Sequence, residues 1–470
     1  MSQTLSWTLT DVQALLPEAR VQSGTPWRNI ERVCTDSRQV QAGDCFVALR
    51  GERFDGHDHL EQAVQAGAVA VMVDCAPDRL RSLDPAVTVI RVEHTRAALG
   101  ECAAAWRQRW GKTLLAVTGS NGKTTVTQMV AAILRAHWGQ DALATEGNFN
   151  NDIGLPLTLL RLRDHHQVAV VELGMNHPGE IAQIAQWARP QAVLVNNAQR
   201  EHQEFMKSVE AVARENASAF DHLADQGLAV FPADDVHTPL WQSLAGRHDT
   251  RTFGRGGQVD LVRHRWMDDH WRLSMVTPLG PLTLQLHMAG EHNLKNAQAA
   301  VALALAAGVH LVDIAQGLNA FRPVRGRSEL MQLDWQGHAV QLFNDTYNAN
   351  PDSVCAAIDT LAALPGPRLM VLGDMGEVGD QGPAFHAEVG AHAATRGIDH
   401  LFTLGELSRH ASAAMPHGQH FDDMAALQHA VVQHMGNLGA VAIKGSRFMR
   451  MEQLVEQVLT LAGRKEASCC

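Results

Sequence analysis

Residues 113–138 place an apolar strand, a glycine-containing loop and a helical segment in succession, and this order constrains the fold more than any other stretch. "TLLAVTG" (113–119) has the continuous apolar run of a buried strand, and "KTTVTQMVAAILRAHW" (123–138) has helical spacing. Two more strands of the buried type, "VAVVELG" (168–174) and "AVLVNN" (192–197), are each followed by helical sequence. Strands that alternate with helices in this way predict an α/β fold with a parallel, doubly wound sheet.

The rest of the chain predicts two further α/β units, one on each side of this central one. At 470 residues the chain is too long for a single hydrophobic core. Short apolar runs predict a small α/β domain over 1–106, followed by the central domain over 107–321. Within the central domain, alternating polar and apolar residues at 250–290 predict an antiparallel hairpin insert. Apolar runs such as "RLMVLGD", "HLFTLG" and "GAVAIKG" predict a third, Rossmann-like α/β domain over 322–470.

Charge and cysteine content narrow the classes of function. The formal net charge is −11 and both signs are mixed along the chain, which disfavours general attraction to nucleic acid or an anionic membrane. The seven cysteines form no CxxC pair, and the terminal Cys469 and Cys470 are expected in an exposed tail with reactive thiols. Neither a signal peptide nor a run of about 18 apolar residues is visible, so we expect a cytoplasmic protein without membrane insertion.

The loop "TGSNGKTT" (118–125) resembles a phosphate-binding loop but is shorter than the usual one. Only two residues separate Gly119 from Gly122, where the Walker pattern has four. Backbone N–H groups at a helix N-terminus attract anions, and glycine allows close approach of a phosphate. Lys123 suits the terminal phosphates, and the Thr124 hydroxyl suits Mg²⁺. A glycine-rich turn without a ligand is the alternative, but the strand before and helix after favour nucleotide binding.

Phosphoryl transfer also needs a carboxylate for the metal ion. Glu172 follows a buried strand directly, at the sheet edge where ligands collect in parallel α/β folds. His202 follows the next strand and is a second candidate ligand, although a single histidine at such a place is more often structural. Glu172 is therefore the first choice for the metal site.

Several separate motifs share one family resemblance. "TDSR", "TGSNGKTT", "EGNFNNDIGLP", "VVELGMNHPGEI", "GEHNLKNAQAA", "GRSE", "NDTYNANPDSV", "GDMGEVG" and "AIKGSR" occur in this order over nearly the whole chain. Together they resemble the Mur ligase family, whose members use ATP to activate a carboxylate as an acyl phosphate that an amine then attacks. The short loop is this family's own form of the phosphate site.

The resemblance implies roles for residues in all three domains. A metal site for Mg²⁺ would use Thr124, Glu172 and His202, and the catalytic set would be Lys123, Glu172, His202, Arg327 and Asp345. Arg327 and Asp345 belong to the third domain, so this assignment predicts a domain closure that excludes water from the acyl phosphate. The implied ATP contacts are Gly119, Ser120, Asn121, Gly122, Lys123, Thr124, Thr125, Asn148, Asn293, Asn296 and Arg327.

The motifs also imply the two co-substrates. "YNANP" is similar to the branch of the family that adds D-alanyl-D-alanine to UDP-MurNAc-tripeptide, giving UDP-MurNAc-pentapeptide, ADP and phosphate for peptidoglycan. Whether that tripeptide ends in meso-diaminopimelate or lysine stays open, and a monomer is expected. The implied substrate contacts are Ser37, Arg38 and His57 for the uridine diphosphate, Asn150 and Asn151 near the peptide end, and Asn348 and Asn350 for the dipeptide.

Asn216 departs from the family pattern. Most members carry there a lysine that is carbamylated and supplies a carboxylate to a second metal ion, and asparagine has neither the amine nor the charge. Either Glu215 or another nearby acid supplies that carboxylate, or the second ion is bound differently. The assignment of His202 depends on which of these holds.

Two classes of alternative function are open. The first is another ligase of the same family, such as the enzyme that forms the tripeptide, but its DNPR-like segment is not found here. The second is a P-loop protein of another class: a kinase, a GTPase or a non-catalytic nucleotide-binding scaffold. A GTPase should carry an NKxD-type motif, which is absent, and a scaffold should have lost Lys123 or Glu172, which are both present.

Overall fold

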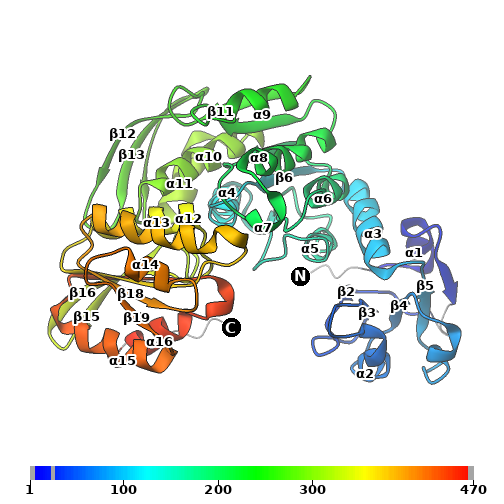
Figure 1. Cartoon of the computed structure of the whole chain (residues 1–470). Helices are drawn as coiled ribbons and strands as arrows, with labels where there is room; N and C mark the ends of the chain where they lie inside the picture. Colours follow the sequence, from blue (N-terminus) through cyan, green and yellow to red (C-terminus); the bar gives the residue numbers. More distant parts are fainter. Residues whose placement is uncertain (1–5, 23–26, 464–470) are drawn as a thin grey trace.

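Three α/β domains follow one another along the chain, with the central domain between the other two (Figure 1). The structure is a computed structural model that describes residues 6–22 and 27–463. The predicted reactive pair Cys469 and Cys470 lies outside the described residues. Within them, no helix is long and apolar enough to cross a membrane.

The N-terminal domain is built on a five-stranded sheet of order β1-β5-β4-β3-β2. Strands β2 to β5 run parallel, and only β1 pairs antiparallel, with β5. Helix α3 leads into the central domain and packs against α1 on one side and α5 and α6 on the other. The elements are α1 (Leu9–Leu15), β1 (Arg20–Gln22), β2 (Arg32–Cys34), β3 (Asp44–Val47), α2 (Leu60–Gln65), β4 (Ala70–Val73), β5 (Thr88–Arg91) and α3 (Thr95–Trp110).

The central domain confirms the predicted parallel sheet. Its six strands, in the order β11-β10-β9-β6-β8-β7, are all parallel. The elements are β6 (Thr113–Thr118), α4 (Lys123–Trp138), β7 (Ala142–Ala144), α5 (Gly154–Leu159), β8 (Val168–Glu172), α6 (Glu180–Ala188), β9 (Ala192–Val195), α7 (Gln203–Met206), α8 (Val209–Ala217), β10 (Leu228–Pro232), α9 (Thr238–Leu244), β11 (Asp249–Phe253), α10 (His292–Ala306) and α11 (Leu311–Ala320).

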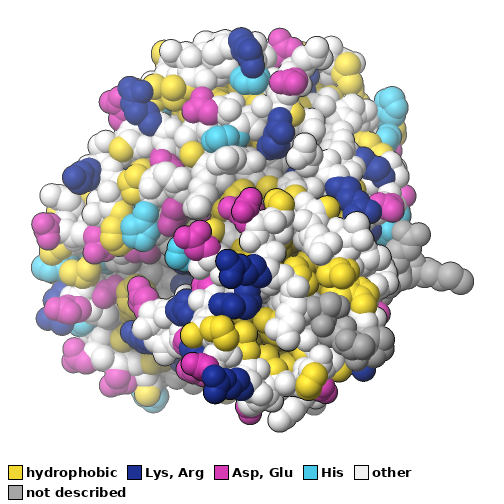
Figure 2. Space-filling model, turned by 90° about the vertical axis from the view of Figure 1, so that its right-hand side faces the viewer, with side chains coloured by type: hydrophobic (Ala, Val, Ile, Leu, Met, Phe, Trp, Pro, Cys, Tyr) yellow, Lys and Arg dark blue, Asp and Glu magenta, His cyan; other side chains and the backbone are white. Residues whose placement is uncertain are grey.

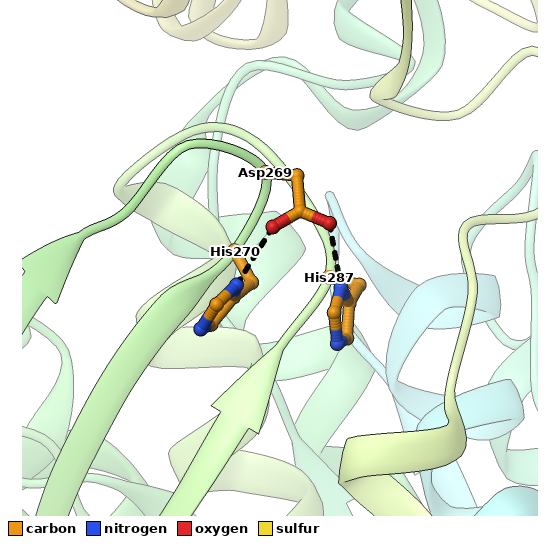
Figure 3. A group of neighbouring side chains, drawn as sticks. All are labelled: Asp269, His270 and His287. Carbon is orange, nitrogen blue, oxygen red and sulfur yellow. Dashed lines mark hydrogen bonds and ion pairs between the residues drawn. The ribbon is translucent and has the colours of Figure 1, made fainter.

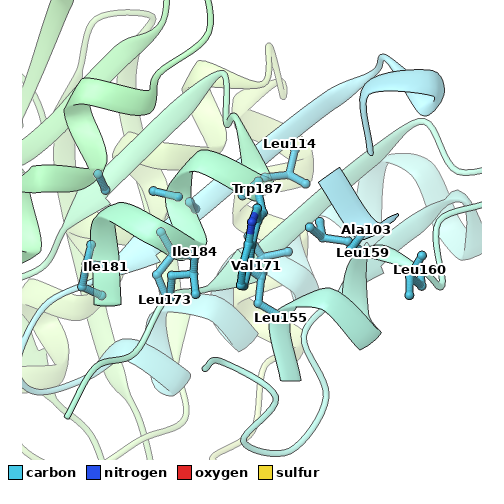
Figure 4. Packing of buried hydrophobic residues seen from close by; sticks show 14 of the residues in the cluster. Ala103, Leu114, Leu155, Leu159, Leu160, Val171, Leu173, Ile181, Ile184 and Trp187 are labelled. Carbon is cyan, nitrogen blue, oxygen red and sulfur yellow. The ribbon is translucent and has the colours of Figure 1, made fainter. Parts of the chain in front are cut away.

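Both faces of this sheet are covered, which explains the continuous apolar runs in its central strands β6, β8 and β9. Along β6, Leu114 and Ala116 pack into the core under α3, α5 and α6, whereas Leu115 and Val117 pack against α4 and α10. Figure 4 shows the first of these cores, with Trp187 of α6 beside Leu114 and Val171. The central strands are therefore fixed on both faces, and their carboxyl ends form a rigid base for the loops that follow.

The predicted antiparallel insert is a separate three-stranded sheet. Strands β12 (Asp260–Trp266), β13 (Trp271–Thr277) and β14 (Gly280–Leu286) form a meander, with Trp271 opposite Leu286 at one end. Its inner residues, such as Leu273 and Leu284, pack on the α10 side of the central domain.

The C-terminal domain has a six-stranded sheet of order β15-β16-β20-β17-β18-β19. Strands β16 to β20 are parallel, and β15 forms an antiparallel hairpin with β16. Helices α12 and α13 cover one face, and α15 and α16 cover the other. The elements are β15 (Glu329–Trp335), β16 (His338–Asp345), α12 (Pro351–Ala362), β17 (Arg368–Gly373), α13 (Gly382–Thr395), β18 (His400–Leu404), α14 (Arg409–Ala413), β19 (Gln419–Phe421), α15 (Met424–His434), β20 (Ala440–Lys444) and α16 (Glu452–Leu461).

On one face of the molecule the charged side chains of both signs can be compared directly. On the face that Figure 2 shows, Lys and Arg side chains are interspersed with Asp and Glu side chains. This mixture agrees with the composition, and it means that an anionic substrate must be held by a local pocket.

Candidate active site

The carboxyl ends of β6, β8 and β9 face the C-terminal domain across a cavity of about 520 Å³. Most residues predicted from the sequence line this one cavity, although they come from two domains. Gly119 lies behind the lining, and Ser37, Arg38 and His57 are in the N-terminal domain, away from the cavity. The predicted residues that line it are Ser120, Asn121, Gly122, Lys123, Thr124, Thr125, Asn148, Asn150, Asn151, Glu172, His202, Asn293, Asn296, Arg327, Asp345, Asn348 and Asn350.

The loop between β6 and α4 needs both of its glycines. Gly119 and Gly122 have φ angles of +126° and +82°, which side chains rarely allow. A Cβ atom on Gly122 would also lie 2.6 Å from Oδ1 of Asn296, and one on Gly119 would lie 3.0 Å from the backbone N of Asn197. The compressed loop is therefore held against the end of β9 and the start of α10, with the N-terminus of α4 opening into the cavity.

Lys123 is the one cationic residue of this loop, and its ammonium group is held by the loop backbone and by Glu201. Its Nζ donates to the backbone O of Gly119 at 2.6 Å and of Ser120 at 3.0 Å, and it pairs with Oε2 of Glu201 at 3.1 Å. Glu201 is only 6% exposed, and its Oε1 has no hydrogen-bond partner among the described residues. A phosphate that binds Lys123 must therefore compete with a buried carboxylate.

Asn216 holds the end of β6. Its side chain is buried, and Oδ1 accepts hydrogen bonds from Oγ1 of Thr118 at 2.5 Å and from the backbone N of Gly119 at 3.0 Å. Its Nδ2 donates to the backbone O of Val212 at 3.1 Å. An uncharged amide thus satisfies polar groups under the phosphate loop. Nearby Glu215 accepts a hydrogen bond from the backbone N of Ile181 at 3.0 Å, at the start of α6.

Glu172 has the environment of a metal ligand. It is 2% exposed at the end of β8, and Oε1 accepts from Nδ2 of Asn150 at 2.7 Å, while Oε2 has no partner among the described residues. A buried carboxylate oxygen without a partner is costly unless a ligand satisfies it. The buried hydroxyl-bearing Thr124 lines the same cavity. Oxygen donors of this kind fit Mg²⁺, which favours a carboxylate with a few further oxygens.

His202 links the central domain to the C-terminal domain. Its Nδ1 lies 2.5 Å from Oε2 of Glu377, and its Nε2 lies 3.9 Å from Oε2 of Glu201. The His202 imidazole, with help from the charges of His177 and Lys123, lowers the pKa of the Glu377 carboxyl against the opposing effect of burial. One imidazole thus sits between two carboxylates at the edge of the phosphate pocket.

Asn293 and Asn296 belong to a buried chain of amides at the start of α10. Nδ2 of Asn296 donates to Oδ1 of Asn293 at 2.9 Å, and Oδ1 of Asn296 accepts from Nδ2 of Asn196 at 2.9 Å. Asn196 also donates to the backbone O of Asn121 in the phosphate loop, at 2.8 Å. The chain ties α10 to the loop, so the two predicted ATP contacts are held firmly in position.

Arg327 and Asp345 reach the cavity from the C-terminal domain. The Arg327 guanidinium lies 3.6 Å from the centre of the Tyr347 ring, which orients it by a cation–π contact. The Asp345 carboxylate accepts a hydrogen bond from the backbone N of Ser328 at 2.8 Å and forms a very short ion pair with the buried Lys444. The C-terminal domain therefore contributes the Arg327 guanidinium to the cavity lining, together with the Lys444–Asp345 ion pair.

The two asparagines of "YNANP" differ in their freedom to bind a ligand. Asn350 caps α12 through Ser353, and its amide exchanges hydrogen bonds with the Asn121 amide, at 2.9 and 3.2 Å. Asn348 is exposed, and among the described residues its side chain makes one hydrogen bond, in which Oδ1 accepts from the neighbouring Ala349 backbone N. Asn350 is thus occupied by contacts inside and between domains, and Asn348 keeps its amide N–H groups free for a ligand.

The three asparagines of "EGNFNN" also differ. Asn148 is exposed and lines the cavity, whereas Asn150 donates to Glu172 as described. Asn151 accepts hydrogen bonds from the backbone N atoms of Ile153 and Gly154, at 3.2 and 2.9 Å, at the start of α5. The structure gives Asn150 a role in orienting the carboxylate and Asn151 a role in the turn.

The three residues predicted for the uridine diphosphate, Ser37, Arg38 and His57, lie in the N-terminal domain but differ in exposure and in their partners. Arg38 is exposed and paired with Asp36, which lowers the pKa of the Asp36 carboxyl to about 2. Ser37 donates to Gln62 at 3.1 Å. His57 is buried; its Nδ1 lies 2.6 Å from Oδ1 of Asp55, and its Nε2 accepts from the backbone N of Asp74 at 3.3 Å. The His57 ring is therefore fully engaged within the domain.

Several charged residues of the cavity were not predicted from the sequence, among them Arg200, Glu201, Glu377 and Lys444. Glu377 and Lys444 lie inside the quoted motifs "GDMGEVG" and "AIKGSR", so the motifs pointed at them without giving a role. Glu201 and Arg200 lie in "QREH", whose unusual charge next to His202 was the available signal. Arg200 forms ion pairs at 2.7 Å with Asp352 and with Glu388 of the C-terminal domain.

Fold and cavity together define a class of protein. A phosphate loop at the carboxyl edge of a parallel sheet, a buried carboxylate with an open oxygen and an arginine from a second domain in one cavity are parts of an ATP-using enzyme.

Comparison of the sequence with models of protein families assigns the chain to one family of ATP-using enzymes. Three family models match: "Mur ligase family, catalytic domain" at 29–107, "Mur ligase middle domain" at 117–304 and "Mur ligase, glutamate ligase domain" at 326–447. The chain belongs to the Mur ligase family.

Similar proteins cover nearly the whole chain. UDP-N-acetylmuramoyl-tripeptide–D-alanyl-D-alanine ligase of Escherichia coli K12 is 39% identical, over 91% of this chain and 93% of the relative. The Bacillus subtilis 168 protein of the same name is 34% identical, over 92% and 93%. A crystal structure of MurF from Acinetobacter baumannii has a TM-score of 0.89 at 33% identity, covering 98% of this chain and all of that one. MurF of Thermotoga maritima in complex with ADP has a TM-score of 0.80 at 25% identity, covering 92% and 98%.

Proposed function

We propose that this chain joins D-alanyl-D-alanine to UDP-MurNAc-tripeptide with ATP, giving UDP-MurNAc-pentapeptide, ADP and phosphate. One observation carries the proposal: the phosphate loop, the Glu172 carboxylate and the C-terminal-domain residues Arg327 and Asp345 all line one cavity. The full-length similarity to ligases of that name in Escherichia coli and Bacillus subtilis supports the choice of co-substrates.

The chemistry follows from the charges in the cavity. The terminal carboxylate of the tripeptide attacks the γ-phosphorus of ATP, giving an acyl phosphate and ADP. The dipeptide amine then attacks the acyl carbon, and phosphate leaves with the original carboxylate oxygen. Because two anions must meet in the first step, the protein must position them and neutralise their charge. Lys123 of the central domain and Arg327 of the C-terminal domain line the same cavity and can supply positive charge for this.

The residues present fit Mg²⁺, which would neutralise phosphate charge when bound. Glu172, with its unpartnered Oε2, and Thr124 would hold one ion. For a second ion, Glu201 replaces the acid that Asn216 cannot provide: it is buried, its Oε1 is open, and it lies beside His202. Glu215 suits this role less well, because it is not among the residues that line the cavity and its Oε1 accepts from the backbone N of Ile181.

The substrate contacts divide between the outer domains. Ser37 and Arg38 are the proposed diphosphate contacts of the N-terminal domain, while His57 fixes its own turn through Asp55 and the backbone N of Asp74. Asn148 and Asn150 face the peptide and phosphate side of the cavity, and Asn151 supports their turn. Asn348 reads the dipeptide, whereas Asn350 joins α12 to the phosphate loop.

We also place the domain boundaries near residues 106 and 321. The first boundary falls inside α3, which packs on both the N-terminal and the central domain. A monomer in the cytoplasm is the arrangement that we propose for the enzyme.

The test is phosphate release from ATP by the purified protein in a matrix of co-substrates. UDP-MurNAc-dipeptide and the tripeptides ending in meso-diaminopimelate and in lysine are each combined with single amino acids and with D-alanyl-D-alanine. The proposal requires release only with a tripeptide and the dipeptide together, and the active tripeptide names the third residue. Release with UDP-MurNAc-dipeptide and a free diamino acid would instead assign the preceding ligase step.

A further inference from the structure

Two histidines and an aspartate meet at one end of the three-stranded insert. The last ladder pair of β13 and β14 is Trp271 opposite Leu286, so His270 and His287, one residue beyond it on each strand, come side by side. Asp269 precedes His270 in the turn from β12. The antiparallel register therefore brings His287 beside Asp269 and His270, and none of the three takes part in the reaction described above.

One carboxylate faces both imidazoles. Oδ1 of Asp269 lies 2.8 Å from Nδ1 of His270, and Oδ2 lies 3.5 Å from Nδ1 of His287. Figure 3 shows the two rings side by side with their Nδ1 atoms turned toward Asp269. The ring centroids are 5.0 Å apart, and one ligand atom from each residue lies within 4.8 Å of the other two. Among the described residues, this is the one group of three His, Cys, Asp or Glu side chains that meets so closely.

The cluster borders a cavity that is separate from the phosphate pocket. This second cavity, of about 420 Å³, lies between the insert and the β15–β16 hairpin of the C-terminal domain, and it shares no lining residue with the first. Asp268, Asp269 and Glu329 contribute negative charge to its wall, and Arg322 contributes positive charge. The Arg322 guanidinium is directed to backbone oxygens of Asn319 and Phe321, at 3.0 and 2.8 Å. The balance favours a cation.

We propose that Asp269, His270 and His287 bind a divalent transition-metal ion such as Zn²⁺ at the seam between the central and C-terminal domains. Two imidazole nitrogens and one carboxylate are a common ligand set for Zn²⁺ and similar divalent transition-metal ions. In a tetrahedral site they leave the fourth position for water. Each ring nitrogen that binds the ion must be free of its proton. With metal–ligand bonds of about 2.0–2.2 Å, the three ligand atoms must lie about 3.5 Å from one another. Rotation of the exposed Asp269 side chain and of the half-buried His270 and His287 rings supplies this movement of roughly 1 Å.

The experiment is a zinc titration of the full chain by isothermal calorimetry. The C469S/C470S background removes the paired terminal thiols, which would bind zinc themselves. Excess Mg²⁺ occupies sites made of oxygen ligands, so that zinc does not bind there. We expect a zinc-binding event that is at least tenfold weaker in each of His270→Ala and His287→Ala.

His264→Ala is the matched control, because His264 is an exposed histidine of the same sheet outside the cluster. It must leave zinc affinity unchanged. An unchanged thermal midpoint without zinc shows that each variant is folded. The proposal is overturned if the chain binds no zinc, or if the double variant His270→Ala/His287→Ala binds zinc as tightly as the parent, which would place the ion elsewhere.

Discussion

Arg200 offers the sharpest test of domain closure, because it reaches from the central domain to two helices of the C-terminal domain. Its guanidinium is 2.7 Å from Asp352 of α12 and 2.7 Å from Glu388 of α13, and it lies 5.1 Å from the centre of the Phe385 ring. The Glu388 and Asp352 carboxylates raise the pKa of Arg200, so the side chain keeps its charge throughout the accessible pH range.

The free energy that the Arg200 ion pairs contribute to domain closure can be estimated from their burial and geometry. Exposed ion pairs contribute about 0.2–1 kcal/mol each, and hydrogen bonds to charged groups contribute roughly 1.5–3 kcal/mol when water is excluded. The Arg200 side chain is 23% exposed, which places its pairs between these limits. Arg200→Ala should therefore weaken the closed arrangement by about 2 kcal/mol, or about 30-fold in the closure equilibrium, at about 1.4 kcal/mol per factor of ten.

The assay is single-molecule energy transfer between a dye on the central domain and one on the C-terminal domain, with and without ADP. Arg200→Ala should move the population toward longer distances, and ADP should restore only part of the closed population. Arg214→Ala is the matched control, because its i,i+4 pair with Glu210 on α8 is exposed and joins no domains. Equal distance distributions for Arg200→Ala and the parent chain would refute the argument that these ion pairs hold the domains together.

Three further perturbations test the phosphate pocket and the thiols. Glu201→Gln should strengthen ADP binding a few fold without Mg²⁺, because Lys123 is released from its ion pair. The same variant should lower the turnover with Mg²⁺ at least tenfold, because the open carboxylate oxygen is lost. If calorimetric ADP affinity and steady-state rate change in the same direction, Glu201 does not have these two separate roles. Asn216→Ala should lower the free energy of unfolding by about 1–3 kcal/mol in urea titrations, since the Gly119 N–H loses its acceptor, and an unchanged midpoint would speak against this support of the loop. Burial raises the pKa of Cys45 to about 12, so iodoacetamide at pH 8 should modify it only after unfolding; mass spectrometry that finds Cys45 alkylated in the folded chain would disprove its protection.

The sequence predicted those parts of the fold that depend on local pattern. Buried strands with continuous apolar runs, such as 113–118 and 168–172, were visible because both faces of the parallel sheet are covered. The hairpin β15–β16 and the short strand β19 were not predicted, because their residues alternate weakly or are few in number. Their place at the two edges of the C-terminal sheet depends on tertiary pairing.

In the candidate site, too, local motifs were predicted from the sequence, whereas contacts between distant residues were not. Motifs named Lys123, Glu172 and Arg327, and the structure places all three around one cavity. Sequence alone could not show that Asn350 is already bonded to Asn121, since that contact joins residues 229 positions apart. Nor could it separate Glu201 from Glu215 as the acid near His202, because burial and hydrogen-bond partners decide between them.

The most direct test of the central claim follows one oxygen atom through the reaction. UDP-MurNAc-tripeptide labelled with ¹⁸O in its terminal carboxylate is incubated with ATP, Mg²⁺, D-alanyl-D-alanine and the purified chain, and the released phosphate is analysed by mass spectrometry. An acyl phosphate predicts that each phosphate formed with the pentapeptide carries one ¹⁸O from that carboxylate. Phosphate without label would contradict the account, because the carboxylate would then never have attacked the γ-phosphorus.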